Sequence, residues 1–375
     1  MSKKGENIYK RKDGRWEARY IKSYNFDGTA RYGYCYGKSY REAKEKVQRE
    51  KSSLITTTTI SAKNNSRKKF SDFCDEWLMV NKIRIKESTF VKYNTIIEKH
   101  IKSKLGGCYI QSLSTVLIEQ FSQELLYVEE LSPKTVKDIL IVLNSVLKYS
   151  ARQYQGPFPN IEVYYPKETK KEMRVLSKEE QVRLVEYLVC KMDECKFGTL
   201  LALLTGMRIG EICALKWENI SIDDGIIKIS STMQRLKDFD INRSYKTKIL
   251  ISEPKSDTST RIIPLNNFAI NLCKKFQSSC PTAYILTGKP YEFIEPRTLQ
   301  YKMEKYTKDC GLKDVHFHTL RHTFATRCVE VGFEIKSLSE ILGHSSPQIT
   351  LERYVHSSLE LKRENMNKLS MMSCL

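Results

Sequence analysis

Four consecutive segments with helical periodicity occupy the middle of the chain, and they constrain its architecture more than any other feature. Between residues 70 and 155, apolar residues recur at the three- and four-residue intervals of amphipathic helices. Ser132-Pro133 supplies an N-cap and a first-turn proline for the last segment, and Gly106-Gly107 separates the second from the third. The pattern predicts a compact helical bundle with separate units before and after it.

Two stretches without this periodicity flank the bundle. Residues 52–69 are polar, basic and low in complexity, which predicts a linker. Gly156-Pro157-Phe158-Pro159 and the charged run around Lys170 indicate a second connector. A chain of 375 residues is long enough for two or three domains that each have a core. The predicted parts are an N-terminal domain, a linker, a helical domain, a connector and a C-terminal domain, over residues 1–51, 52–69, 70–157, 158–171 and 172–375.

The N-terminal segment is basic and rich in aromatic residues. Its first 51 residues hold 15 lysines and arginines against 7 acidic residues, a local charge of +8. Turn dipeptides at Asp13-Gly14 and Asp27-Gly28 predict three short strands, and a helix is expected over residues 39–51. The cations could form the exterior of a structural module, or they could contact DNA, because a β-sheet fits the major groove. The candidate DNA-contacting residues are Arg11, Lys12, Arg15, Trp16, Arg19 and Tyr20.

Composition narrows the possible partners and the compartment. The net charge of +19 favours a polyanionic partner. No apolar run approaches the roughly 20 residues of a membrane span, and no signal peptide opens the chain, so a cytoplasmic protein is expected. The 11 cysteines include no CxxC pair, which favours reduced thiols over disulfides or a zinc site.

The C-terminal domain is predicted to begin with a capping box at Ser177-Lys178-Glu179-Glu180. Arg208 follows a glycine turn between apolar helices, where a guanidinium group is difficult to bury without an anion. The alternative is an ion pair between Arg208 and Glu211. Three strand-like segments follow, and Lys255 lies in the turn between the last two. A lysine in a turn is ordinarily solvated.

A second group of polar residues lies between residues 318 and 354. His318 and Arg321 are three residues apart on a predicted helix that ends near Gly332, so both can reach one anion. They could equally be a solvated pair. His344 follows a probable helix end at Leu342-Gly343, and Tyr354 lies in a segment opened by Ser346-Pro347.

Taken in order, these residues read Arg, turn Lys, His-x-x-Arg, Gly-His and Tyr. The set resembles the tyrosine recombinase, or phage integrase, family. The resemblance implies a fold that is mainly α with small β-sheets (α+β). It also implies an N-terminal sheet that binds arm-type DNA sites, a helical core-binding domain and a mixed α/β catalytic domain. The implied catalytic residues are Arg208, Lys255, His318, Arg321, His344 and Tyr354, with Glu211 supporting the site and with Lys246 and Lys248 as rivals for Lys255.

The resemblance implies a reaction that these residue types suit. Fixed guanidinium and imidazole donors would hold the charge on a scissile phosphate. Tyr354 would attack, forming a 3′-phosphotyrosyl link, and nearby cations would favour its deprotonation. Lys255 would protonate the departing 5′ oxygen. No cofactor, ATP or metal ion is expected.

In the helical domain, the residues expected near DNA phosphates are Lys86, Ser88, Thr89, Lys92 and Tyr93.

The expected partners are double-stranded DNA at core and arm sites, three further copies in a homo-tetramer, and a directionality factor. The tail after Tyr354 would dock on a neighbouring subunit or pack on its own domain. The protein would integrate and excise a mobile element, phage or conjugative, in the bacterial cytoplasm at the nucleoid. Two alternatives remain open at this point, a type IB topoisomerase and a DNA-binding regulator without catalysis.

Overall fold

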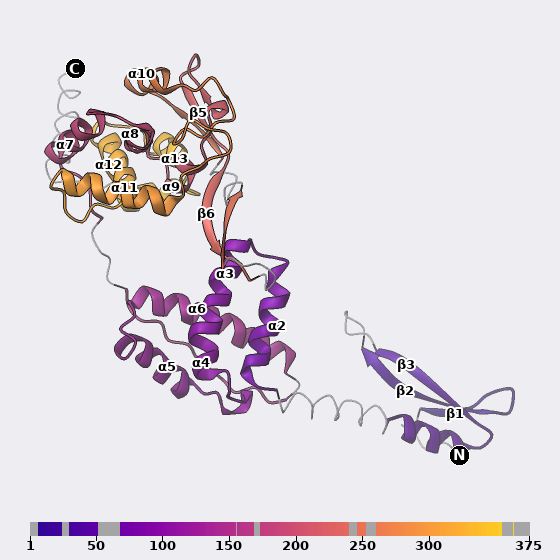
Figure 1. The fold of residues 1–375 in the computed structure, drawn as a ribbon. Helices are drawn as coiled ribbons and strands as arrows, with labels where there is room; N and C mark the ends of the chain where they lie inside the picture. The colour runs from indigo at the N-terminus through magenta and orange to yellow at the C-terminus, as the bar shows by residue number, and fades with distance from the viewer. Residues whose placement is uncertain are drawn as a thin grey trace, which may run out of the picture. The chain divides into compact units, whose positions relative to one another are not determined.

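The computed structural model describes residues 7–24, 30–51, 68–154, 156–168, 173–239, 246–252, 260–354 and 363. The chain divides into two compact units, Met1–Thr169 and Lys170–Leu375. The described residues form many helices and three small antiparallel sheets (Figure 1), which confirms the predicted α+β class. Across the described ranges, no helix combines the length and the apolar character needed to cross a bilayer.

The N-terminal sheet contains β1 (Ile8–Lys10), β2 (Trp16–Tyr24) and β3 (Ala30–Gly37) in the order β1-β2-β3. A helix over residues 40–51 follows. The predicted turn at Asp13-Gly14 is confirmed, with Gly14 at a φ of +84°. The other predicted turn, Asp27-Gly28, lies outside the described residues.

One face of this sheet packs on a small core. Ala18 and Tyr20 are buried with three further residues, Ile8, Ala43 and Val47. Gly33 lies opposite Tyr20 in the register, and a Cβ at Gly33 would come within 2.6 Å of the tyrosine ring. The glycine therefore makes room for that ring. The expected DNA contact of Tyr20 is wrong, because the side chain is only 8% exposed and belongs to the core.

The helical part of this unit matches the predicted bundle. Its α-helices are α2 (Phe70–Lys82), α3 (Glu87–Ile96), α4 (Lys102–Leu105), α5 (Thr115–Tyr127) and α6 (Pro133–Gln153). A π-helical turn, Ile97–Ile101, joins α3 to α4, so the second predicted helix is continuous up to Gly106. Ser132 caps α6 by accepting a hydrogen bond from the Thr135 amide at 3.2 Å. α6 contributes eight buried residues to the core of the bundle.

The second unit contains helices both before and after its strands in the sequence. They are α7 (Lys178–Val189), α8 (Glu194–Thr205), α9 (Ile209–Ala214), α10 (Asn267–Phe276), α11 (Pro296–Asp309), α12 (Phe317–Glu330), α13 (Ile335–Leu342) and α14 (Pro347–Tyr354). The predicted capping box at Ser177 and Glu180 is present. The glycine turn before Arg208 is also confirmed, because Gly206 ends α8 at a φ of +66°.

Two small sheets lie between these helices in the sequence. β4 (Ile220–Ser221), β5 (Ile226–Ile229) and β8 (Arg261–Pro264) form one sheet, and β6 (Thr232–Lys237) pairs with β7 (Thr247–Ser252) in the other. The sequence did not predict β6, whose exposed positions include Arg235 and Lys237 and whose hydrophobic alternation is weak. Lys255 was expected between two strands of a hairpin. That pairing is wrong for the described residues, because β7 pairs with β6 while β8 pairs with β5.

The bundle core gives a stability prediction for α6. Leu140 is fully buried, whereas its neighbour Ile141 is 44% exposed. Leu140→Ala should cost about 2–5 kcal/mol because it removes apolar contacts and leaves a cavity. Urea unfolding followed by Trp77 fluorescence, with Trp16 and Trp217 replaced by Phe, measures the effect. Ile141→Ala is the matched control, and an equal loss in both variants would contradict the assigned packing.

Candidate active site

A pocket of 290 Å³ in the second unit gathers residues from several helices. It is lined by Arg208, His318, Arg321, Gly343, His344, Ser345, Ile349 and Arg353. Four of the six expected catalytic residues therefore share one pocket. The lining contains three arginines and, within the described ranges, no carboxylate. Such a pocket suits an anion.

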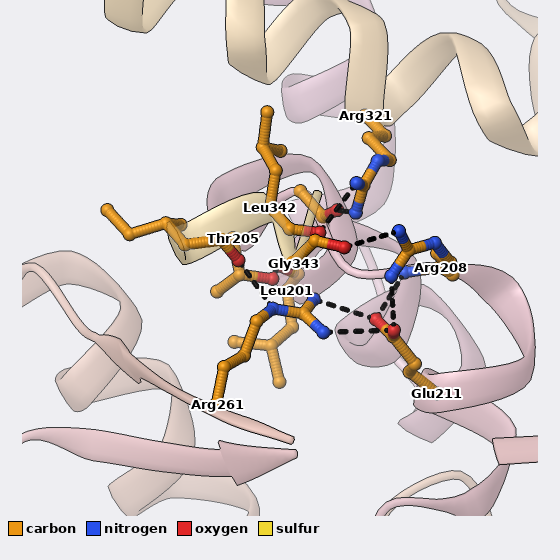
Figure 2. A network of polar contacts seen from close by, with 10 residues as sticks. Leu201, Thr205, Arg208, Glu211, Arg261, Arg321, Leu342 and Gly343 are labelled. Carbon is orange, nitrogen blue, oxygen red and sulfur yellow. Dashed lines mark hydrogen bonds and ion pairs between the residues drawn. The ribbon is translucent and has the colours of Figure 1, made fainter. Parts of the chain in front are cut away.

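The C-terminal end of α13 organises the arginines around this pocket. Its last carbonyl groups, on three consecutive residues, each accept a hydrogen bond from a different arginine (Figure 2). The pairs are Arg261 Nε to Ile341 O at 2.5 Å, Arg321 to Leu342 O at 2.6 Å and Arg208 to Gly343 O at 3.0 Å. Carbonyls at a helix end lack partners within the helix and carry its negative partial charge. The helix end therefore both satisfies and orients the guanidinium groups.

Arg321 is the most deeply buried of these arginines, at 2% exposed. It also donates to the carbonyl of Gly206, at the end of α8, at 2.8 Å. Burial, followed by the charge of Arg208, lowers the pKa of Arg321 to about 9, although Glu211 opposes the shift. The side chain consequently remains a cation at neutral pH, and it is held by two helix ends.

Glu211 supplies the countercharge from the first turn of α9. Its two carboxylate oxygens accept from Arg261 at 3.0 and 2.9 Å, and Oε1 also accepts from Arg208 at 2.8 Å (Figure 2). Burial alone would raise the pKa of Glu211, but Arg261 and Arg208 together lower it to about 2. The expected pairing of Arg208 with Glu211 is present. The carboxylate thus fixes Arg208 at the edge of the pocket.

The two expected histidines line the same pocket as the arginines. His344 follows α13, and its Nδ1 lies 2.8 Å from Thr350 Oγ1. Burial and the nearby arginines lower the pKa of His344 to about 3. The pKa of His318 is lowered as well, first by burial and then by His322 and Arg321. Both rings are therefore neutral at pH 7 and can each donate one hydrogen bond.

Tyr354 lies at the end of α14 and is 5% exposed. Its hydroxyl lies 2.9 Å from Nδ1 of His322, and its ring stacks parallel to that of His344 with centroids 6.3 Å apart. The expectation that nearby cations favour its deprotonation holds for their own effect, but not for the net shift of its pKa. Arg321 and Arg353 do lower the pKa of Tyr354, but burial outweighs them and the net shift is upward. The resting side chain is a neutral phenol.

Two protein-family models match this chain. The Phage integrase family matches residues 174–360, and the Phage integrase N-terminal SAM-like domain matches residues 69–126. The chain belongs to the phage integrase family.

Several relatives resemble most of the chain. A tyrosine recombinase XerC-like protein of Caldanaerobacter subterraneus subsp. tengcongensis is 26% identical over 86% of this chain and 87% of its own length. The integrase of Staphylococcus phage L54a is 24% identical over 87% of this chain and 96% of its own length.

Solved structures of the family share the fold. The Tn1549 transposon integrase, in complex with a circular intermediate DNA, covers 79% of this chain and 99% of its own, at 20% identity and a TM-score of 0.63. A λ integrase tetramer bound to a Holliday junction covers 93% of this chain and 95% of its own, at 18% identity and a TM-score of 0.57.

Besides Arg353, which lines the pocket, sequence reasoning missed two further residues of the site of this integrase. Arg261 is an inward-facing residue of β8, and His322 directly follows Arg321. A signal existed for each of them. Alternate residues of a half-buried strand point into the core, and an arginine that points inward needs a carboxylate partner. His322 lies four residues after His318, on the same helix face. Lys255 lies outside the described residues, between β7 and β8.

The expected DNA-binding residues of the N-terminal sheet fall on different faces. Arg19 lies on the face opposite the core, with its guanidinium carbon 4.2 Å from the centre of the Tyr32 ring. Exposed Tyr34 lies opposite Arg19, and exposed Tyr36 has Arg11 and Arg15 near its ring. Lys12 is exposed in the turn. Trp16 instead packs edge-on against Tyr40, with ring centroids 5.3 Å apart. The exposed tyrosines of β3 were not predicted.

In the helical domain, the expected phosphate contacts lie at the start of α3. Lys86 is the exposed N-cap residue, and Thr89 is half-buried in the first turn. Lys92 is exposed and forms an ion pair with Asp138 at 2.8 Å. Tyr93 packs against Trp77 with ring centroids 5.5 Å apart. Tyr93 therefore contributes to the core of the bundle as well as to its surface.

The Glu211 network predicts a dependence of stability on pH. Because the folded pKa of Glu211 lies below its ordinary value of 4.5, its contribution is present above about pH 5 and is lost as the pH falls toward 2. Glu211→Gln should cost on the order of 3 kcal/mol at pH 7, since it leaves two arginines without a countercharge. The deficit should shrink as the pH is lowered.

Urea midpoints of the wild type and the variant at pH 7 and pH 4 measure this. Glu186→Gln, on the exposed side of α7, is the control and should change neither midpoint. A deficit of the same size at both pH values would show that the charge of Glu211 is not what stabilises the arginines.

Proposed function

We propose that this integrase cuts and rejoins DNA through a 3′-phosphotyrosyl intermediate formed by Tyr354, and thereby integrates and excises a mobile element. One observation carries the proposal. Arg208 and Arg321, from different elements, line one pocket with His318 and His344, and the Tyr354 hydroxyl lies close enough to Arg321 for that cation to lower its pKa. The nucleophile and the anion site thus belong to the same subunit.

The arrangement suits a phosphodiester in its transition state. Charge increases on the non-bridging oxygens as the nucleophile approaches, and fixed guanidinium groups stabilise that charge without having to reorient. Arg208 and Arg321 are held by helix-end carbonyls, so their cost of ordering is met in the folded state. Neutral His318 and His344 would add hydrogen bonds to the same oxygens. Tyr354 would attack the phosphorus, and the 5′ oxygen would leave.

Lys255 is proposed as the group that protonates the leaving oxygen. It lies in the segment between β7 and β8, and β8 also carries Arg261 of the arginine network. Energy stored in the phosphotyrosyl bond would support rejoining, so the proposed reaction uses no metal ion and no ATP. Cleavage should accordingly proceed unchanged in a chelator.

Around this catalytic domain, residues 172–375, we place a core-binding domain at residues 70–157 and an arm-binding domain at residues 1–51. Residues 52–69 and 158–171 would connect them. The exposed arginines and tyrosines of the N-terminal sheet support the arm assignment, because cations and aromatic rings on one sheet face suit a DNA groove. The working form would be a homo-tetramer on core and arm sites, with a directionality factor favouring excision, in the bacterial cytoplasm at the nucleoid.

The nucleophile can be tested with a suicide substrate, a nicked core site that traps the covalent adduct. The wild type should form an adduct that denaturing gels resolve, and Tyr354→Phe should form none because it lacks the attacking oxygen. Tyr291→Phe, at a 93% exposed position, is the matched control and should react normally. Absence of a wild-type adduct would refute the catalytic proposal, and an adduct formed by Tyr354→Phe would refute the choice of residue.

The arm-binding face gives a separate prediction. Arg19→Ala should weaken binding to an arm-site duplex by roughly tenfold and reduce the slope of log K against log salt by about 0.9, as expected for one lost phosphate contact. Arg41→Ala removes the same charge from the helix on the other side of the sheet, where the side chain is 90% exposed. Titrations at several salt concentrations should leave the Arg41 variant close to wild type. Equal effects of both variants would indicate non-specific attraction alone.

A further inference from the structure

His322 is a histidine of the site that the family motif given above does not include. It follows Arg321 on α12, and its Nδ1 lies 2.9 Å from the hydroxyl oxygen of Tyr354. The two rings are tilted by 50° with centroids 5.7 Å apart, and their polar atoms are in hydrogen-bonding contact. His322 is half-buried and does not line the pocket. It therefore contacts the tyrosine rather than the bound anion.

The Tyr354 hydroxyl has two polar neighbours, Arg321 and His322, that differ in the hydrogen bonds they can form. Arg321 can only donate a hydrogen bond, whereas a neutral imidazole nitrogen can accept one. The other two histidines are less suited to accept this proton. His344 has its Nδ1 engaged with Thr350, and the closest ring contact of His318 is an edge-to-face approach to His322 at 4.5 Å. Among the described residues, His322 thus holds the acceptor position beside the Tyr354 hydroxyl.

We propose that His322 is the general base of the cleavage step. Its Nδ1 accepts the hydrogen bond of the Tyr354 hydroxyl in the resting state and takes that proton as the phenol attacks. The Tyr354 oxygen forms its bond to phosphorus while the bond from phosphorus to the 5′ oxygen breaks. Lys255 gives a proton to that 5′ oxygen. In rejoining, His322 returns the proton to the departing phenolate. This inference rests on Tyr354 being the nucleophile.

The protonation state of the ring supports this role. Burial, followed by Arg353 and Arg321, lowers the pKa of His322 to about 4, so the ring is neutral at pH 7 and Nδ1 has a free electron pair when Nε2 carries the proton. A base with so low a pKa binds a proton weakly. Entry of a phosphodiester adds a negative charge beside the same two arginines and offsets their effect. The ring becomes a stronger base when substrate is present.

The test uses single-turnover cleavage of the suicide substrate by the full-length protein. His322→Asn keeps an oxygen that can accept the phenol hydrogen bond but cannot take up the proton. Adduct formation should slow by about 100-fold or more, which is the usual contribution of a general base. His316→Asn is the matched control, since His316 is the exposed N-cap residue of the same helix and asparagine suits that position. It should react at the wild-type rate.

A second substrate separates the base from the acid. A 5′-bridging phosphorothiolate has a thiolate leaving group that departs without a proton. It should restore cleavage by Lys255→Ala and leave His322→Asn slow. His322→Gln serves as the second variant if thermal denaturation shows that the asparagine variant is not folded.

Two outcomes would overturn the inference. In one, His322→Asn and His322→Gln cleave at the wild-type rate, so a hydrogen bond suffices or none is needed. In the other, the phosphorothiolate restores them, which would place His322 at the leaving group. Either result leaves the wild-type adduct intact. Failure of the wild type to form any adduct would instead remove the proposed function itself.

Discussion

The site depends on the placement of three arginines in the second unit, of which Arg261 and Arg321 are buried and Arg208 is partly exposed. A guanidinium group does not lose its proton at any relevant pH, so each one needs acceptors when water is excluded. The end of α13 supplies them, because Ile341, Leu342 and Gly343 offer consecutive free carbonyls to Arg261, Arg321 and Arg208. Gly343 makes this possible by adopting a φ of +63°, which turns the chain out of the helix.

The same constraint positions the remaining parts of the site. Because Gly343 is held by Arg208, the residue that follows it, His344, enters the pocket at a fixed point. Arg321 ties the end of α13 to the end of α8 through Leu342 and Gly206. One buried carboxylate, Glu211, then joins Arg208 to Arg261. Residues separated by more than a hundred positions in the sequence are thereby held as one rigid anion site.

Much of this architecture could be predicted from the sequence because the signals are local. The capping box at Ser177, the N-cap at Ser132 and the glycine turn at Gly206 all lie where short-range backbone preferences placed them. The partners of Arg261 were not predictable from local signals, because Glu211 and the Ile341 carbonyl lie far away in the sequence. The pairing of β7 with β6 was not predictable either, because tertiary packing determines which strands pair.

The expectation that Arg19 and Tyr20 both contact DNA conflicts with the geometry of a β-strand. Arg19 and Tyr20 are adjacent in β2, and adjacent residues in a strand point to opposite faces. They cannot both contact one DNA groove from a single sheet face. Burial of Tyr20 against Gly33 places Arg19 on the exposed face with Tyr32 and Tyr34. The interleaving of cations and aromatic rings predicts a DNA-binding surface on this sheet, but the two-residue period of a strand decides which of these side chains can share it.

The resting state of Tyr354 reflects two opposed requirements of reversible strand exchange. A phenolate beside the arginines would be stabilised as an anion and would be a weaker nucleophile. A phenol buried without any cation nearby would have too high a pKa to lose its proton readily. Burial raises the pKa of Tyr354 while Arg321 and Arg353 lower it, so the two effects act against each other. In the proposed reaction the proton would stay on the tyrosine until its oxygen attacks the phosphorus. Because rejoining follows the same path backwards, the group that receives the proton must remain beside the hydroxyl, and His322 on the rigid helix α12 satisfies that condition.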